Sequence, residues 1–465
     1  MIGKCRPVSG HCRMATAPLF EPVQPMRTPD WVPVWRGFFG ERLRNTIYGW
    51  PEPAFDADIR TRRVLGFTVH IVSQPAAVER VLLGNKANYE RPGIARRILS
   101  PLVGNGLLSA EGEDWRKQRR IVAPTFAPGA VAAMAPLMDA AAKREVADWP
   151  QRDARLDLAQ AATRTTMAII ADALFGGDAR LCDPAGARHI ETLLAAAGQA
   201  RFMTMLGLQE LDPSPGMRRA RVSRAWLRKT LSDLVRERGP EGGGDDFFGG
   251  LIRALHGQFT PDEAVELAVD NAITFFVAGH ETTANALAWT IYCLAAQPAL
   301  QDEARSEAVA ALALPVAERA AAMPLLHQIL EESMRLYPPA PRFDREALAG
   351  DVLSGVNIAK GDLISIWPWV IHRHRSLWPN PDRFDHTRFA PQAKARQHRF
   401  QFIPFGGGPR VCVGARFATV EALLILARWL AARRFSVPPG WRPDPYGSVT
   451  LRPRGGIILR AELLA

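Results

Sequence analysis

The stretch FGGGPRVCVG at residues 405–414 decides how the rest of the chain is interpreted. Three consecutive glycines and a proline lead into Cys412, and a segment of helical composition follows at 415–433. A thiol just before a helix N-terminus faces backbone N–H groups and the positive end of the helix dipole. This placement predicts a lowered pKa for Cys412 and a thiolate that acts as nucleophile or metal ligand. A buried structural thiol is the alternative, but the glycines would let the backbone approach a flat, bulky group.

A second stretch, AGHETT at 278–283, lies within the longest predicted helix. Capping residues at 260–263 begin that helix, and its pattern continues for about 36 residues, or roughly 54 Å. Its second half is apolar on nearly every face, which predicts a helix through the interior. Glu281 would be costly to bury unpaired, and Thr282 can bond back to a carbonyl one turn earlier. A helix kink and a site that delivers protons to a ligand both remain open.

Two shorter patterns, Glu332 with Arg335 and Trp115 with Arg119, are weak signals alone and are interpreted with the residues around them. Glu332 and Arg335 are three residues apart and can pair on one helix face, with Arg388 between aromatic residues downstream. A buried Glu332 held by both arginines would form an ionic network, whereas a surface ion pair is the alternative. Trp115 and Arg119 are four residues apart and could hold an anionic group. An ordinary basic amphipathic helix is the alternative for that second pair.

The composition is that of a globular protein, with 465 residues, 47% hydrophobic and 23% charged. Length alone suggests about three domains. Five irregularly spaced cysteines without a C-x-x-C pair argue against a disulfide framework or a zinc ribbon. Since no signal peptide and no apolar run of about 18 residues appear, we expect a cytoplasmic chain without a transmembrane anchor. Residues 1–27 are expected to form a flexible tail.

The net charge of +11 favours a nucleic acid, an anionic membrane surface or an acidic protein as partner, unless it is only a solvated surface. No zinc-finger or RNA-recognition signature and no block of like charges occurs, so nucleic acid is not expected. Strand-like runs are few, at 64–72, 362–370 and 455–463, and helical patterns dominate elsewhere. The chain is therefore predicted to be mainly α with a smaller β portion.

Together the four stretches resemble the cytochrome P-450 haem-thiolate monooxygenases. Residues 405–414 match the family pattern F-G-x-G-x-R-x-C-x-G, and 278–283 match A/G-G-x-D/E-T-T/S. Residues 332–335 match E-x-x-R, and 115–119 match W-x-x-x-R, in the family's order and at its usual spacing. The resemblance covers residues 28–465 and implies a single cytochrome P-450 fold around a buried haem. That expectation overrules the three domains suggested by length.

The resemblance also implies roles for individual residues. Cys412 matches the axial ligand of the iron of haem b, and thiolate ligation favours O–O cleavage in this family. The other positions that match cofactor-binding residues are Trp115, Arg119, Arg345, Phe405, Arg410 and Gly414. Thr282 and Glu281 match the alcohol and acid that deliver protons to dioxygen. Glu332, Arg335 and Arg388 match a buried structural triad, although Thr387 before Arg388 departs from the commoner P-E-R-F.

The implied reaction inserts one oxygen atom of O2 into a C–H or double bond of a small hydrophobic substrate. No flavin, iron–sulfur or dinucleotide signature is present, because GNGLLS at 104–109 lacks the third glycine. Two electrons must then come from a separate acidic ferredoxin or flavodoxin with its reductase. A basic face including Arg410 and Arg416 would steer that partner. The alternatives are a peroxygenase or isomerase, or a non-catalytic haem sensor, and Thr282 and Glu281 argue against these.

The same resemblance implies that the substrate pocket draws on five segments, at 93–112, about 196–225, 273–282, 339–343 and 448–450. Its prominent side chains are Phe202, Met203, Met205, Phe275 and Phe276. Phenylalanine and methionine fit a hydrophobic substrate, but they are equally compatible with ordinary core packing.

Overall fold

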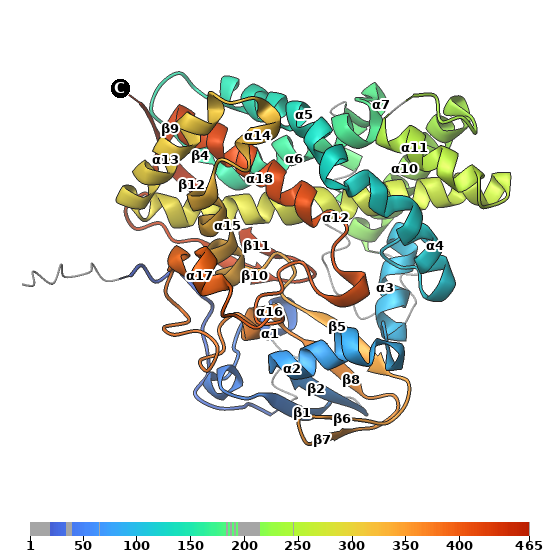
Figure 1. Ribbon diagram of the computed structural model, residues 1–465, viewed down its shortest axis with the longest axis vertical. Coiled ribbons are helices and arrows are strands. Elements are labelled where there is room, and N and C mark those ends of the chain that lie inside the picture. The colour runs from blue at the N-terminus through green and yellow to red at the C-terminus, as the bar shows by residue number, and fades with distance from the viewer. Residues whose placement is uncertain are drawn as a thin grey trace, which may run out of the picture.

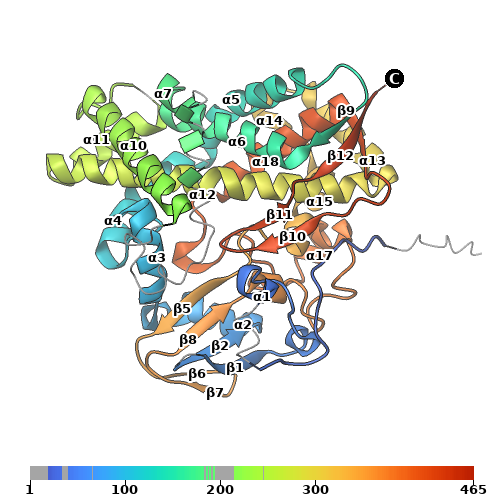
Figure 2. The same ribbon diagram turned by 180° about the vertical axis from the view of Figure 1, so that it is seen from behind.

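The computed structural model of the chain describes residues 19–33, 40–64, 66–182, 185–186, 188–189, 192–193, 214–244 and 246–464. Most helices gather in one part of the molecule, and the sheet of the blue and orange segments lies in the other (Figure 1). Helix α12 (Pro261–Ala295) crosses between these parts, and the same arrangement is seen from behind (Figure 2). The expected fold, mainly α with a smaller β portion, is confirmed.

Helix α12 has 35 residues and forms close to where the sequence predicts it. A capping box joins Thr260 and Glu263 at its start, with Pro261 at the first helical position. Gly279 lies in its interior, where glycine costs about 1 kcal/mol relative to alanine. A Cβ at Gly279 would lie 2.7 Å from Cδ1 of Ile170, so the glycine admits helix α6 (Leu158–Phe175) at close range.

The other helices pack around α12 or cap the sheets. The longer ones are α3 (Gly93–Val103), α4 (Gly112–Val122), α5 (Pro128–Ala147), α10 (Pro215–Arg238), α11 (Phe247–His256), α13 (Pro298–Leu312), α15 (Pro324–Leu336) and α18 (Ala415–Ala432). The short ones are α1 (Glu41–Arg44), α2 (Pro75–Glu79), α7 (Ala179–Cys182), α14 (Val316–Arg319), α16 (Pro368–Ile371) and α17 (Pro391–Lys394).

The described part of the chain contains four small sheets. A five-stranded sheet has the order β1-β2-β8-β5-β3, a three-stranded sheet the order β4-β12-β9, and β10-β11 and β6-β7 form two-stranded pairs. The strands are β1 (Ile59–Val64), β2 (Phe67–Val72), β3 (Tyr89–Glu90), β4 (Ala154–Asp157), β5 (Phe343–Ala347), β6 (Asp351–Leu353), β7 (Val356–Ile358), β8 (Leu363–Ile366), β9 (Arg433–Ser436), β10 (Asp444–Gly447), β11 (Leu451–Arg454) and β12 (Ile458–Leu463).

The strand-like runs of the sequence are shorter in the structure than expected. The run 64–72 is divided by a turn at Gly66, whose φ of 85° is left-handed, so that β1 pairs with β2. The run 362–370 contributes β8 and then turns into α16 at Pro368. Proline at the first helical position explains why a β-rich composition ends there.

The first described residues pack on the body of the molecule. Phe20 accepts a backbone hydrogen bond from Phe384 at 2.8 Å, and Val23 accepts one from the Tyr337 hydroxyl at 2.5 Å. Of the expected tail at 1–27, residues 1–18 lie outside the described part. None of the described helices is by itself long and apolar enough to cross a membrane; one pair, Gly112–Phe126 and Pro128–Ala147, bent by 59°, meets the length and composition criteria together.

Candidate active site

The loop that carries Cys412 is closed by its own backbone. The Cys412 N–H donates to the Phe405 carbonyl at 2.9 Å, and the Val411 N–H donates to Gly408 at 3.1 Å. Helix α18 starts directly after Gly414, as the sequence predicts. The loop therefore places the thiol just before the N-terminus of α18, which can be followed in Figure 1.

The sequence analysis expected the glycines of this loop to make room for a flat group, but two of them allow close packing against other parts of the protein. A Cβ at Gly408 would lie 2.0 Å from the Leu82 carbonyl oxygen, and one at Gly407 would lie 2.7 Å from the Phe400 ring. Both glycines therefore let the loop pack against the protein itself. Gly406 differs, since a Cβ there would meet nothing within 4 Å. The interpretation that the glycines make room for a flat group thus fails for two of the three.

The Cys412 thiol is accessible, yet protein surrounds it. Burial raises its pKa, while the Gly414 N–H and the charge of Arg119 lower it, and the net shift is upward. The predicted lowering is therefore wrong for the protein alone, because burial outweighs the helix terminus. A thiol that is accessible and yet has protein on most sides is placed as the ligand of a bulky metal-centred cofactor would be.

Three arginines, Arg91, Arg345 and Arg410, gather on one side of this loop around the Glu111 carboxylate. Arg410 pairs with Glu111, and Arg91 Nη1 lies 3.9 Å from the same carboxylate. The pKa of Arg345 is lowered to about 10, first by burial and then by Arg91, whereas Glu111 and Asp344 act in the opposite direction. The pKa of Arg410 is likewise lowered to about 10, first by burial. Three half-buried guanidiniums beside the carboxylates of Glu111 and Asp344 are suited to hold an anionic group.

Helix α4 brings two more of the predicted residues to the same place. The Arg410 guanidinium lies over the Trp115 ring, 4.5 Å from its centroid. Burial lowers the pKa of Arg119, and the neighbouring Cys412 thiol acts in the opposite direction. The structure therefore brings together Trp115, Arg119, Arg345, Arg410 and Cys412. Their chemistry, a thiol beside cationic groups, fits haem b with its two carboxylates.

The face of α12 near this loop is less buried than the rest of the helix. Ala278 is exposed, and Glu281 and Thr282 are half-buried, while the helix on both sides of them is buried. The Thr282 hydroxyl donates to the Ala278 carbonyl at 2.8 Å, which is the back-bond expected from sequence. One oxygen of Glu281 accepts a hydrogen bond from the Thr450 hydroxyl at 2.7 Å. An alcohol and an acid thus border accessible space in an otherwise closed helix.

A second carboxyl group near α12 was not found by the sequence analysis. Glu421 on α18 is fully buried, and among the described residues neither of its oxygens accepts a hydrogen bond within 3.5 Å. Burial raises its pKa from 4.5 to about 8, and the nearby Thr283 hydroxyl acts in the opposite direction. Glu421 is therefore neutral at pH 7. The signal was present in the sequence, as a single acid within the apolar run of 420–430.

The predicted Glu332, Arg335 and Arg388 also meet in the interior. Two nitrogens of Arg335 donate to the two oxygens of Glu332 at 2.7 and 2.8 Å, and Arg388 Nε lies 3.5 Å from Glu332. Arg335 also donates to the His372 carbonyl at 2.7 Å. The His372 ring in turn accepts a hydrogen bond from the Ile403 N–H at 2.9 Å. This chain of contacts connects the ionic network to the start of the Cys412 loop.

The segment GNGLLS at 104–109 binds α12 rather than a dinucleotide. The Asn105 N–H donates to Asp270 at 2.7 Å, and the Leu107 N–H donates to Asn271 at 3.0 Å. A Cβ at Gly104 would lie 2.1 Å from the Asp270 carboxylate, which explains the glycine. The loop is therefore a fixed part of the wall beside α12.

The predicted pocket side chains are only partly within the described structure. Phe202, Met203 and Met205 lie outside the described residues. Phe275 and Phe276 are buried in the core, where Phe276 stacks on another ring at 4.7 Å. The sequence left open whether these phenylalanines contact a substrate or pack in the core. In the structure, both contribute to core packing.

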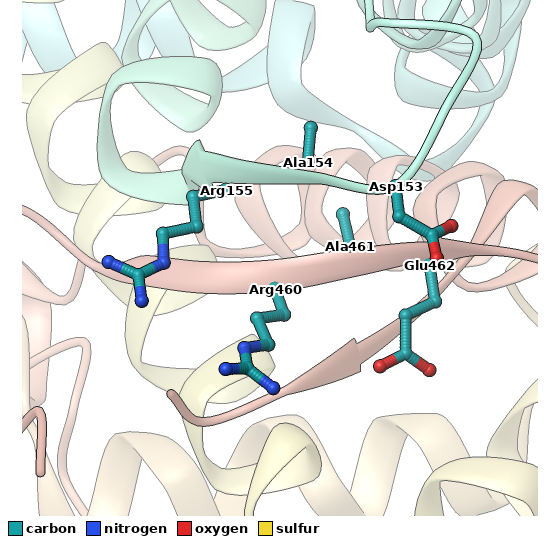
Figure 3. A pocket seen from close by; sticks show the side chains of 6 residues that line it. All are labelled: Asp153, Ala154, Arg155, Arg460, Ala461 and Glu462. Carbon is teal, nitrogen blue, oxygen red and sulfur yellow. The ribbon is translucent and has the colours of Figure 1, made fainter. Parts of the chain in front are cut away.

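A separate surface pocket of about 370 Å³ lies over the β4–β12 pair (Figure 3). Its six lining residues are Asp153, Ala154, Arg155, Arg460, Ala461 and Glu462. No thiol, no aromatic side chain and none of the predicted residues line it, so it is not the candidate active site.

Comparison with known proteins agrees with this arrangement. The family model described as Cytochrome P450 matches residues 58–460. The chain is 31% identical, over 82% of each chain, to cyclooctat-9-en-7-ol 5-monooxygenase of Streptomyces melanosporofaciens. It is 28% identical to the putative cytochrome P450 132 of Mycobacterium tuberculosis, over 90% of this chain and 91% of that one.

A solved structure gives the same result for the fold. The crystal structure of the cytochrome P450DA heme domain superimposes with a TM-score of 0.79. The match covers 96% of this chain and 99% of the other at 23% sequence identity. At that identity the likeness concerns the fold alone.

Proposed function

The chain belongs to the cytochrome P450 family and is a haem b monooxygenase, and from this premise we propose that Cys412 is the axial thiolate ligand. The observation that carries the assignment is an accessible thiol enclosed by protein at a helix N-terminus. The other cysteine with a described side chain, Cys293, is fully buried, and burial raises its pKa.

We propose that the arginine cluster holds the carboxylates of the haem. Arg345, Arg410 and Arg119 supply the positive charge, and Trp115 supplies an indole N–H. Phe405 and Gly414 complete the loop beside the cofactor. When bound, haem supplies the activation of dioxygen, which no side chain of the protein can perform.

The protein's own contribution to the reaction is proton delivery. The Thr282 hydroxyl and the Glu281 carboxyl lie at the accessible face of α12 and are proposed to pass protons to dioxygen. Glu332, Arg335 and Arg388 are proposed to stabilise the fold around the Cys412 loop. Residues 28–465 are proposed to form one haem domain, and the contacts of Phe20 and Val23 extend it towards residue 19.

The proposed substrate is a small hydrophobic molecule, oxidised at a C–H or double bond with O2. A relative named for oxygenation of cyclooctat-9-en-7-ol supports this class. The two electrons are proposed to come from a separate acidic ferredoxin or flavodoxin. Arg416 is exposed four residues after Cys412 and could bind this partner, as could Lys117 and Arg120, which are exposed on α4, whereas Arg410 pairs with Glu111.

The difference spectrum of the reduced, carbon monoxide-bound protein tests the assignment. A Soret band at the thiolate position is expected for the protein, and Cys412→Ala should abolish it. A band at the histidine-ligated position would contradict the assignment.

Turnover separates the alternatives. With a reductase system present, a monooxygenase forms product from O2 and uses one electron pair for each oxygen inserted. Product from hydrogen peroxide alone would indicate a peroxygenase, product without any oxidant an isomerase, and ligand binding without turnover a sensor. Thr282→Ala should divert electrons from product to hydrogen peroxide.

A further inference from the structure

We propose that Thr450 is a positioning residue for Glu281. Its hydroxyl holds the carboxylate of the acid on the β10–β11 side of α12, and so links the turn at 448–450 to proton delivery. The proposal rests on the function proposed above for Glu281. It adds a residue that no motif predicts, on a hairpin 169 residues further along the chain.

The contact itself is short and isolated. The Thr450 hydroxyl donates to Glu281 Oε1 at 2.7 Å, a length typical of a hydroxyl that donates to a charged carboxylate. Among the described residues, no lysine or arginine forms an ion pair with Glu281, and no other hydrogen bond to its carboxylate is found. The orientation of this carboxylate therefore depends on one hydroxyl group.

The hairpin that carries Thr450 is fixed on both strands. The Leu451 N–H donates to the Pro339 carbonyl at 2.9 Å, at the start of β11. On β10, the Asn45 side chain accepts from the Gly447 N–H at 2.9 Å and donates to the Pro445 carbonyl at 3.0 Å. Both ends of the turn are thus held by other parts of the chain. A donor on such a support is preorganised for its acceptor.

The turn also presents an apolar side chain to accessible space. Val449 is 57% exposed, although its neighbour Thr450 is buried. The Ser448 N–H donates to the Thr450 carbonyl at 2.9 Å, so the three residues move as one tight turn. A hydrophobic substrate that contacts Val449 therefore touches the same turn that holds Glu281. Substrate binding and orientation of the acid are linked through Thr450.

Matched variants of Thr450 test the contact in the haem-loaded enzyme. Thr450→Val keeps the shape but removes the hydroxyl, and Thr450→Ser keeps the hydroxyl. The measurement is hydrogen peroxide released per electron pair consumed, from pH 6 to 9, with a hydrophobic ligand chosen by its spin-state shift. Peroxide forms when O2 takes two electrons and two protons without oxygen insertion. Loss of one hydrogen bond should raise its release about fivefold in Thr450→Val and leave Thr450→Ser close to the wild type.

A double-mutant cycle with Glu281→Ala provides a measurement that does not depend on turnover. The melting temperatures of the haem-loaded proteins should be non-additive for Thr450→Val and Glu281→Ala, because the two residues share one contact. Thr450→Val should likewise add nothing to peroxide release once Glu281 is absent. If Thr450→Val does not fold, Thr450→Ala takes its place in the cycle.

Additive melting temperatures, or an equal effect of Thr450→Val with and without Glu281, would overturn the proposal. Failure of the proposed function has a different signature. In that case Glu281→Ala and Thr282→Ala leave peroxide release unchanged, while the melting-temperature cycle still shows whether Thr450 holds Glu281.

Discussion

Glu421 makes the stability of the protein depend on pH in an unusual direction. Its pKa is about 8 in the folded protein and 4.5 for the ordinary carboxyl, so the folded state binds the extra proton between these values. The free energy of unfolding should therefore fall as pH rises from about 4.5 to 8, by up to about 1.4 kcal/mol per pH unit. Glu421→Gln should remove this slope and make the protein relatively more stable at pH 9.

Urea unfolding at pH 5, 7 and 9 measures the effect. Glu303→Gln is the matched control, because Glu303 is exposed on α13 and its substitution should leave the slope unchanged. Parallel pH dependences for Glu421→Gln and the wild type would show that Glu421 does not titrate in this range.

Two glycines of the Cys412 loop allow backbone strain and packing to be separated. Gly406 and Gly408 both have left-handed φ angles, of 73° and 67°, so alanine strains either position by about 1–3 kcal/mol. Only at Gly408 does a Cβ also collide with the Leu82 carbonyl. Gly408→Ala should therefore destabilise the protein by about 1–3 kcal/mol more than Gly406→Ala. Thermal unfolding, with the fraction of protein that gives the thiolate band, measures the difference; equal losses would contradict the packing argument.

At the scale of elements, His372 connects α15 to the Cys412 loop. Its carbonyl accepts from Arg335, its ring accepts from the Ile403 N–H, and burial holds its pKa well below the usual range. His372→Leu leaves a buried N–H without an acceptor, at a cost of about 1–3 kcal/mol. The fraction of protein that loses the thiolate band in mild urea should rise. His372→Gln keeps an acceptor and should retain more of the band, and equal losses in both variants would contradict the role of the ring.

The elements themselves were largely predictable, and the reasons are local. Capping residues and apolar periodicity specify α12 within one residue of its observed end. The run 64–72 was misjudged because a single glycine at residue 66 turns one apparent strand into a hairpin. The contacts of residues that act over long distances in the chain gave no signal in the sequence, although Thr450 lies in the segment 448–450 that the family resemblance assigned to the substrate pocket. Arg91, His372 and Thr450 acquire partners only when segments far apart in the chain meet.

At the scale of the whole molecule, the net charge of +11 should attract an acidic redox partner, and exposed basic side chains contribute to that attraction. Arg416 is exposed four residues after Cys412, and Lys117 and Arg120 are exposed on α4, so substituting each with glutamate should slow reduction by an acidic ferredoxin several-fold at low salt. The difference should shrink as ionic strength rises, because salt screens the attraction. Stopped-flow reduction measures the rates. Lys360→Glu, at the far end of the five-stranded sheet, changes the charge equally and should have little effect; an equal slowing would show that only net charge matters.

The arginine cluster around Glu111 has a practical consequence for production of the enzyme. Without its cofactor the protein keeps several buried cations close together, and their repulsion weakens the folded state. Ligands that bind only the folded state shift the folding equilibrium in proportion to their supply. The yield from a recombinant host should therefore follow the host's porphyrin biosynthesis. A culture fed with a porphyrin precursor should give more intact enzyme from the same amount of messenger RNA.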